Sequence, residues 1–325
     1  MKLAAYLGGV LGLALLIVLV LRADSAAMLH TLGLAGWRLL WLVPYRILFY
    51  LLYAVGWLIL LQPCDPQRRA GLGYLLWVTT VREGIDRLLP VASVGGGVIA
   101  VRMLRWRGLS TAPVAASVIV EVLLTLIVAY LFTAVGLLVL VHLRATGVDQ
   151  YRHLVAIFVL SLPVPVTMAL LLRYGSVFKR LEGILQRMVV VNALAGEAEL
   201  LDRALRASLR RGWSLVRAGS LQFAAFLSGA FEVWLALRLF GHPVGVTASL
   251  VLESMTQAVR HLAFIIPAGL GVQEAGLMVF GQIIGISGEL ALAVSMAKRL
   301  REVLCGLPAL LSWQWVEARR LRSPS

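Results

Sequence analysis

Several apolar runs in this chain have the length that is needed to cross a lipid bilayer. The hydrocarbon core of a membrane is about 30 Å thick, which a helix crosses in about 20 residues. Residues 3–21 are the clearest example, because they hold no charge and lie between Lys2 and Arg22. The apolar core of a secretory signal peptide is shorter, so we interpret this run as a first membrane span.

Composition supports a membrane location for the whole chain. Charged residues make up 14% of the 325 residues and hydrophobic residues 60%, whereas a soluble domain is about 25% charged. A soluble protein of this composition would lack the polar surface it needs in water. These values exclude a soluble globular enzyme, an intrinsically disordered protein and a secreted disulfide scaffold.

The hydropathy pattern predicts an all-α polytopic membrane protein with six full spans. They cover residues 3–21, 39–61, 112–141, 154–172, 215–240 and 293–315. Two further stretches, residues 72–107 and 247–288, are divided by charges, prolines and glycines into apolar pieces of about 10–14 residues, too short to cross alone. We predict two broken or re-entrant helical hairpins there. Pairs of tilted, kinked full spans are the alternative.

The two broken stretches resemble each other in the order of their residues. Arg82 precedes a Leu-Leu-Pro that ends at Pro90, and Arg260 precedes an Ile-Ile-Pro that ends at Pro267. Glycines follow both prolines: Gly95, Gly96 and Gly97 in the first stretch, Gly269 and Gly271 in the second. This order predicts an inverted repeat, in which two broken helices meet near the middle of the membrane.

The basic residues orient the chain, because Lys and Arg concentrate in the cytoplasmic loops of membrane proteins. Basic clusters near residues 68–69, 102–107 and 173–217, and the C-terminal arginines, are therefore expected on the cytoplasmic side. Six spans and two hairpins then place both termini in the cytoplasm, and the hairpins enter from opposite faces. We expect a multi-pass protein of the bacterial cytoplasmic (inner) membrane.

Three segments are expected along the chain. They are a first membrane half at residues 1–172, a connector at 173–214 and a second membrane half at 215–325. The connector is predicted to be a basic amphipathic helix pair on the inner leaflet, with a solvated linker as the alternative. Anionic lipid headgroups at the cytoplasmic face explain the net charge of +14, so nucleic acid is not an expected partner.

Charged residues inside apolar segments are the strongest candidates for a functional site, because each costs roughly 2.5–3.5 kcal/mol at the centre of a membrane helix. The candidates for substrate binding are Arg82, Arg260, Glu121, Glu253, Arg299 and Glu274. The two prolines and the glycines after them are candidates for hinges, whose free N–H groups attract anions. The alternatives are interfacial salt bridges for the charges and close helix packing for the glycines.

The sequence contains no motif for catalysis or for a cofactor. Its five histidines have no metal-ligand spacing, and Cys64 and Cys305 lie far apart in the sequence. A nucleophile elbow, a dinucleotide fingerprint and a P-loop are all absent. We therefore expect no metal, no cofactor and no catalytic residue, and any transport must be downhill, ion-coupled or driven by a partner.

Two ordered motifs carry a family resemblance. The first comprises Val-Arg-Glu-Gly-Ile at 81–85, Leu-Leu-Pro-Val-Ala-Ser-Val-Gly-Gly at 88–96 and Ala-Ala-Ser-Val-Ile-Val-Glu at 115–121, and the second is Ile-Pro-Ala-Gly-Leu-Gly-Val-Gln-Glu at 266–274. Together they resemble the membrane region of lysylphosphatidylglycerol synthase/flippase proteins, in particular the branch associated with hopanoid biosynthesis. The chain ends at Ser325, with no room for the soluble aminoacyl-transfer domain of the fused relatives, so lipid synthesis is not expected.

The resemblance implies an integral membrane flippase or transporter, not an enzyme, that moves a phospholipid or hopanoid-type lipid between leaflets. We expect Arg82 and Arg260 to contact the headgroup, and Glu121, Glu253 and Arg299 to line or gate its path. One alternative is a scaffold that binds lipid-biosynthetic enzymes through the connector. The other is an intramembrane lipid-modifying enzyme. The lipid, the direction and energy source of its movement, and homo-oligomerisation are left open.

Overall fold

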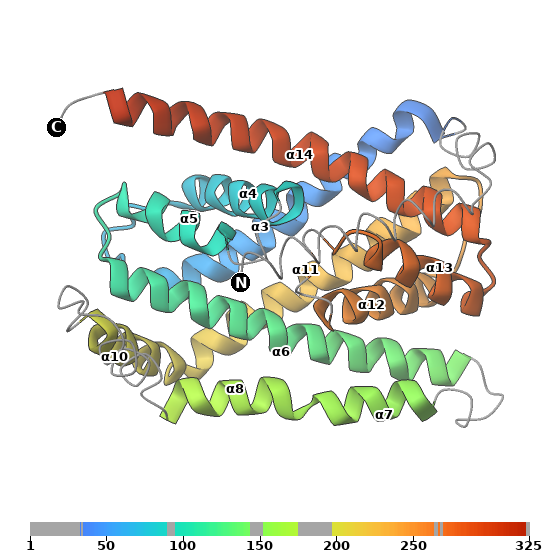
Figure 1. Ribbon diagram of the computed structural model, residues 1–325, viewed down its shortest axis with the longest axis horizontal. Helices are drawn as coiled ribbons and strands as arrows, with labels where there is room; N and C mark the ends of the chain where they lie inside the picture. Colours follow the sequence, from blue (N-terminus) through green and yellow to red (C-terminus); the bar gives the residue numbers. More distant parts are fainter. Residues whose placement is uncertain are drawn as a thin grey trace.

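The computed structural model describes residues 33, 35–89, 95–143, 152–174, 197–262, 266 and 269–322. These residues form helices joined by turns and bends, with no strand among them (Figure 1). The predicted all-α fold is confirmed. The predicted span at residues 3–21, Pro90, Pro267 and the first part of the connector lie outside the described residues.

The helices are named here in chain order, with the bounds that the structure gives them. They are η1 (Gly36–Trp41), α3 (Leu42–Leu61), α4 (Leu72–Leu88), α5 (Gly95–Arg105), α6 (Thr111–Leu143), α7 (Arg152–Ser161), α8 (Pro163–Tyr174), α10 (Glu197–Leu209), α11 (Gly212–Leu239), α12 (Val246–Leu262), α13 (Val272–Ile284) and α14 (Gly288–Arg322).

Four helical segments among the described residues are long and apolar enough to cross a membrane. They are Gly36–Leu61, Thr111–His142, His153–Tyr174 and Gly212–Leu239, and they match the second to fifth predicted spans. The last predicted span lies within α14, which has 35 residues and is about 50 Å long. Charged side chains in its middle explain why α14 is not among the four apolar segments.

The fourth predicted span is present and contains a one-residue break at Leu162. α7 ends at Ser161 and α8 begins at Pro163. Proline has no N–H group to continue the helical hydrogen bonds, and its ring clashes with the preceding turn. Only 6% of the apolar window in this segment is buried, so α7 and α8 present most of their surface outward.

Helices α4 and α5 form the first predicted hairpin. The hydroxyl of Tyr74, near the start of α4, donates to the carbonyl oxygen of Met103, near the end of α5, at 2.6 Å. At the other end of the pair, the N–H of Gly96 donates to Asp86 Oδ1 at 3.0 Å. The two helices therefore run antiparallel. With 17 and 11 residues, they are about 25 and 16 Å long, which is shorter than a bilayer core.

Helices α12 and α13 form the second predicted hairpin. Arg260, near the end of α12, donates through Nη1 to Gln273 Oε1, near the start of α13, at 3.2 Å. Gly269 and Gly271 between the helices have φ angles of 59° and 72°. A side chain disfavours this left-handed conformation, so glycine is required at this turn.

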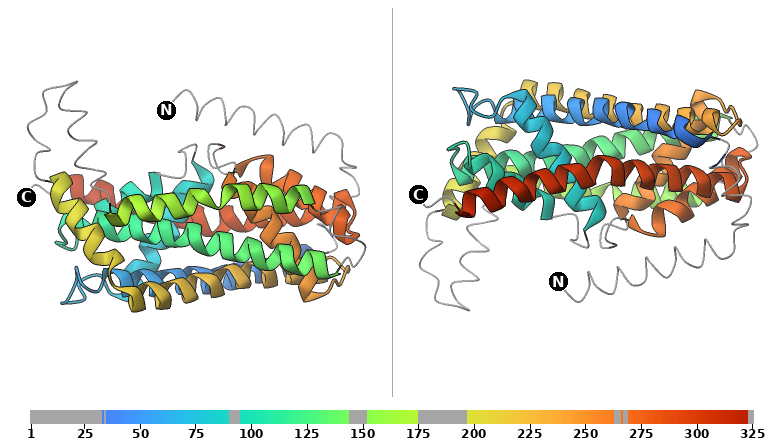
Figure 2. Two further views of the ribbon diagram at one scale, coloured as in Figure 1. Left: turned by 90° about the horizontal axis from the view of Figure 1, so that it is seen from below. Right: turned by 90° about the horizontal axis from the view of Figure 1, so that it is seen from above.

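The two hairpins enter the bundle from opposite ends (Figure 1). α4 and α5 lead from the end where α3 finishes and α6 starts, whereas α12 and α13 lead from the end where α11 finishes and α14 starts. The two further views agree that the C-terminal ends of α4 and α12 lie in the middle of the molecule (Figure 2), and both line one cavity there. This is the arrangement that an inverted repeat predicts.

The buried apolar side chains form a large cluster around each hairpin. One cluster joins α12 and α13 to α11 and α14, and includes Leu252 and Leu277. The other joins α4 and α5 to α3 and the start of α6, and includes Leu75 and Met103. Each hairpin is therefore held by its own apolar core.

Gly136 of α6 allows α6 to pack closely against Ser254 of α12. A Cβ atom at this position would lie 2.5 Å from the Cβ of Ser254. We expect Gly136→Ala to lower the free energy of unfolding by about 1–3 kcal/mol, the usual cost of overpacking. Thermal unfolding followed by size-exclusion chromatography measures this loss.

A second substitution tests the steric explanation of this loss. Ser254→Gly removes the atoms that the new methyl group meets, so the double variant should be more stable than Gly136→Ala alone. Gly219, also in a membrane helix, serves as the control, because its added Cβ would meet Leu124 at an ordinary 3.5 Å. Equal losses for alanine at both glycines would contradict the explanation.

Candidate functional site

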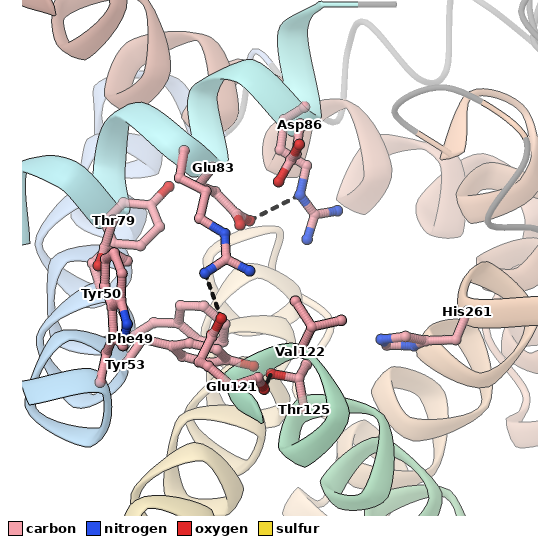
Figure 3. A pocket seen from close by; sticks show the side chains of 13 residues that line it. Phe49, Tyr50, Tyr53, Thr79, Glu83, Asp86, Glu121, Val122, Thr125 and His261 are labelled. Carbon is pink, nitrogen blue, oxygen red and sulfur yellow. Dashed lines mark hydrogen bonds and ion pairs between the residues drawn. The ribbon is translucent and has the colours of Figure 1, made fainter. Parts of the chain in front are cut away.

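A cavity of about 200 Å³ lies between α3, α4, α6 and the end of α12. Aromatic side chains of α3 form one wall, and charged side chains of α4 and α6 form others. Figure 3 shows His261 of α12 facing Glu83 and Asp86 of α4 across the cavity, with Glu121 of α6 on a third side. Both hairpins thus contribute to one cavity in the middle of the bundle.

Arg82 and Glu121 form an ion pair in the cavity wall, through Arg82 Nη1 and Glu121 Oε2. The Glu121 side chain is almost fully buried, whereas the Arg82 side chain is 18% exposed. Buried charges in a membrane protein are tolerated when they are paired. Arg82 therefore reaches the cavity, as the headgroup hypothesis requires, but one of its nitrogen atoms is already bound to a carboxylate.

Glu83 binds two arginines from different helices. Its Oε1 lies 2.6 Å from Arg46 Nη2 of α3 and 2.8 Å from Arg87 Nε, one turn further along α4. The Arg46 guanidinium also lies 3.7 Å from the ring centroid of Phe49, a cation–π contact that fixes its position. Arg87 lines the cavity, and its Nη1 is buried without a hydrogen-bond partner among the described residues.

One turn of α14, residues 298–302, makes charged contacts with four other helices. Lys298 Nζ lies 2.6 Å from Glu253 Oε2 of α12, and Arg301 Nη2 lies 2.8 Å from Glu232 Oε1 of α11. All four of these side chains are at most 5% exposed. These two pairs hold α14 against α11 and α12.

The same turn connects the two hairpin tips. Arg299 Nε lies 3.1 Å from Glu274 Oε1 at the start of α13, and Arg299 Nη2 donates to the carbonyl oxygen of Gly269 at 3.2 Å. Arg299 Nη1 also lies 3.1 Å from Glu302 Oε2. Glu302 Oε1 in turn lies 3.9 Å from Arg87 Nη1 in the last turn of α4. A continuous series of opposite charges thus runs from one hairpin tip to the other through α14.

Arg260 and Asp86 differ from the other charged side chains at the hairpin tips. Among the described residues, no carboxylate lies within 4.0 Å of Arg260, which donates to Gln273 instead. Asp86 likewise has no ion pair there and accepts a hydrogen bond from the N–H of Gly96. Each tip therefore carries one charge that the described protein does not neutralise directly, positive on α12 and negative on α4.

The structure divides the predicted substrate-binding residues into two groups. Arg82 and Glu121 line the cavity. The other four lie nearby in the contacts described above: Arg260, Glu253, Arg299 and Glu274.

The predicted hinge glycines of the first hairpin belong to α5. Gly95, Gly96 and Gly97 form the first turn of α5. A Cβ atom on Gly96 would lie 2.6 Å from Asp86 Oδ2 and 2.7 Å from the carbonyl oxygen of Arg82. Gly96 is thus required for close packing of the hairpin, and its N–H binds Asp86 instead of an added anion.

Several charged residues of this site were not among the substrate-binding residues predicted from the sequence. Arg46, Arg87, Glu232, Lys298, Arg301 and Glu302 are absent from the predicted substrate-binding set. Arg46 and Glu232 each interrupt an otherwise apolar span. A charge inside such a span could have identified both residues as candidates for the site. Among the described residues, no group of three potential ligands is placed to hold a metal ion.

Comparison with known proteins agrees with the motif resemblance. The family described as the lysylphosphatidylglycerol synthase TM region matches residues 6–308 of the chain. No curated protein and no solved structure matches it. The family match includes both hairpins, the cavity and the 298–302 turn, and indicates a function related to membrane lipids. It does not single out the hopanoid-associated branch. The chain belongs to the family of the lysylphosphatidylglycerol synthase membrane region.

Proposed function

We propose that this protein moves a lipid with a phosphate headgroup between the two leaflets of the membrane. The observation that carries the proposal is the charged cavity at the meeting of two opposed hairpins. A headgroup that crosses a bilayer must exchange its water for polar protein groups, because unpaired charge in hydrocarbon is strongly disfavoured. The cavity supplies such groups in the middle of the bundle.

The chemistry of the cavity favours an anionic group. Arg82 and Arg87 both line it, and Arg87 Nη1 makes no hydrogen bond among the described residues, with Glu302 Oε1 at 3.9 Å. Arginine binds phosphate oxygens through planar, charge-assisted hydrogen bonds. Arg260, with no carboxylate partner among the described residues, offers a second position near the tip of α12.

A phospholipid fits these residues better than an uncharged hopanoid does. An uncharged polycyclic lipid would offer no charged acceptor to Arg87 Nη1, which makes no hydrogen bond among the described residues. The exposed arginines support a bacterial cytoplasmic membrane location with the α10 end of the bundle inside. Among these are Arg68 in the turns between α3 and α4, Arg105 at the end of α5, Arg203 in α10, and Arg319 and Arg322 at the end of α14. Figure 1 shows the ends of α5 and α14 at the same end of the bundle as α10.

A leaflet-accessibility assay tests this function. The purified protein is reconstituted into liposomes with fluorescent lipids that carry anionic, zwitterionic or uncharged headgroups, and dithionite then quenches the outer leaflet. We expect quenching beyond the outer-leaflet fraction for phosphate lipids, and less of it for Arg260→Gln.

Arg102→Gln is the control for this experiment, because Arg102 lies exposed at the end of α5, away from the cavity. It should transport as the wild type does. Quenching that stays at the outer-leaflet fraction for every headgroup would contradict the proposal.

A further inference from the structure

Helix α10 carries a groove formed by arginines, at the end of the bundle and away from the cavity. The groove has a volume of about 290 Å³ and is lined by Arg203, Arg206, Ala207 and Arg210. Residues at these spacings fall within about 100° around a helix, so they share one face. Three cationic side chains are therefore gathered along one stripe.

The opposite face of α10 fixes the direction of this stripe. Leu205 is 1% exposed in the apolar cluster around α4 and α5, and Leu201 and Leu209 pack against the same cluster. α10 also packs against α6 and α8. The arginine face is therefore turned away from the described part of the bundle, and neither its apolar clusters nor the cavity includes these arginines.

The surroundings of α10 are those of a membrane interface. Trp213, just after α10, and Tyr174, at the end of α8, are 73% and 72% exposed. Exposed Trp and Tyr at helix ends are typical of the headgroup layer. Figure 1 places α10 at the same end of the bundle as the ends of α5 and α14, which also carry exposed arginines.

The charges within the groove leave it strongly positive. Arg203 Nη2 donates to Glu199 Oε1 at 2.6 Å, and both side chains are largely exposed, so this pair contributes little stability. Among the described residues, no carboxylate lies within 4.0 Å of Arg206 or Arg210 to neutralise them. Guanidinium groups in this arrangement match phosphate oxygens, which accept several N–H groups at once.

We infer that the α10 groove is a binding site for an anionic phospholipid of the surrounding leaflet. The positive charge selects the phosphate and a net negative headgroup, and the interfacial position brings that headgroup within reach. The site is separate from the transport cavity, and the inference does not depend on the proposed function.

Native mass spectrometry of the full chain in detergent tests the site directly. The probes are dioleoylphosphatidylglycerol and dioleoylphosphatidylcholine, added in equal amounts. We expect the wild type to retain phosphatidylglycerol preferentially. The variant Arg203→Gln/Arg206→Gln/Arg210→Gln should bind it more weakly, by on the order of tenfold.

A matched variant removes the same charge from the same end of the molecule. Arg68→Gln/Arg105→Gln/Arg322→Gln changes three exposed arginines on different elements and should bind within about twofold of the wild type. If the groove variant does not fold, Arg206→Gln alone is measured.

Three results would overturn the inference. They are equal loss in the groove and control variants, unchanged binding in the groove variant, and no preference for phosphatidylglycerol in the wild type. Unchanged binding would favour an acidic protein segment, instead of a lipid, as the ligand of the groove.

Discussion

Arg87→Gln is expected to reduce transport of a phosphate lipid by roughly 10- to 100-fold while the protein remains folded. A hydrogen bond to a charged group contributes about 1.5–3 kcal/mol, and each 1.4 kcal/mol corresponds to about tenfold. Arg87 lines the cavity, and its Nη1 makes no hydrogen bond among the described residues. Under the proposed function, its loss removes a contact to the headgroup.

The ion-pair network explains why this substitution spares the fold. Glu83 keeps Arg46 as a partner at 2.6 Å, and Glu302 keeps Arg299 at 3.1 Å. Neither carboxylate is left buried without a cation. Arg82 is a poorer choice for the same test, because its removal leaves Glu121 buried without its partner.

Arg46→Gln is the matched control for Arg87→Gln. Both substitutions remove one of the two arginines that bind Glu83, but only Arg87 lines the cavity. The leaflet-accessibility assay and thermal unfolding are measured on both variants. Equal transport losses, or a transport loss that follows the loss of stability, would show that Arg87 acts through the fold instead of through the lipid.

Glu253→Gln is expected to destabilise the protein by about 3–5 kcal/mol, which is the usual cost of removing one partner from a buried ion pair. Lys298 and Glu253 are 5% and 4% exposed, and their charged atoms lie 2.6 Å apart. The substitution leaves the Lys298 ammonium among apolar helices. Thermal unfolding in detergent and the yield of folded protein measure the effect.

The double variant Glu253→Gln/Lys298→Met separates loss of a charge partner from loss of shape. It removes both charges, and the glutamine introduced at position 253 would still reach the side chain of Gln257, which donates to Glu253 at 2.8 Å in the wild type. Most of the lost stability should return. A double variant as unstable as the single one would mean that packing, and not the unpaired charge, causes the loss.

The membrane spans were predictable from sequence because they depend on local composition. An apolar run of about 20 residues is typical of a helix that crosses a bilayer. Proline and glycine have local effects too, so the division of residues 72–107 and 247–288 into short helices could be predicted. Pro163 explains the break between α7 and α8 by the same local effect of proline. This break was not predicted, because the apolar run around it is uninterrupted.

The sequence could not predict which charged residues pair with each other. Arg301 and Glu232 are about 70 positions apart along the chain, and Arg87 and Glu302 more than 200. Each arginine in the sequence had several carboxylates available at similar distance along the chain. The choice between them depends on which helices pack together, and that packing involves both hairpins and both halves at once.

The sequence by itself determined that this protein crosses a membrane, that two segments are broken, and which end carries the basic residues. Hydropathy, helix breaking and charge distribution are local properties, so they can be read along the chain. Only the tertiary structure decided that both hairpins contribute to one cavity, that Arg87 Nη1 makes no hydrogen bond there among the described residues, and that Glu253 is buried in an ion pair with Lys298. Those roles depend on the neighbours that each charge acquires in the folded chain, because burial and pairing fix its energy.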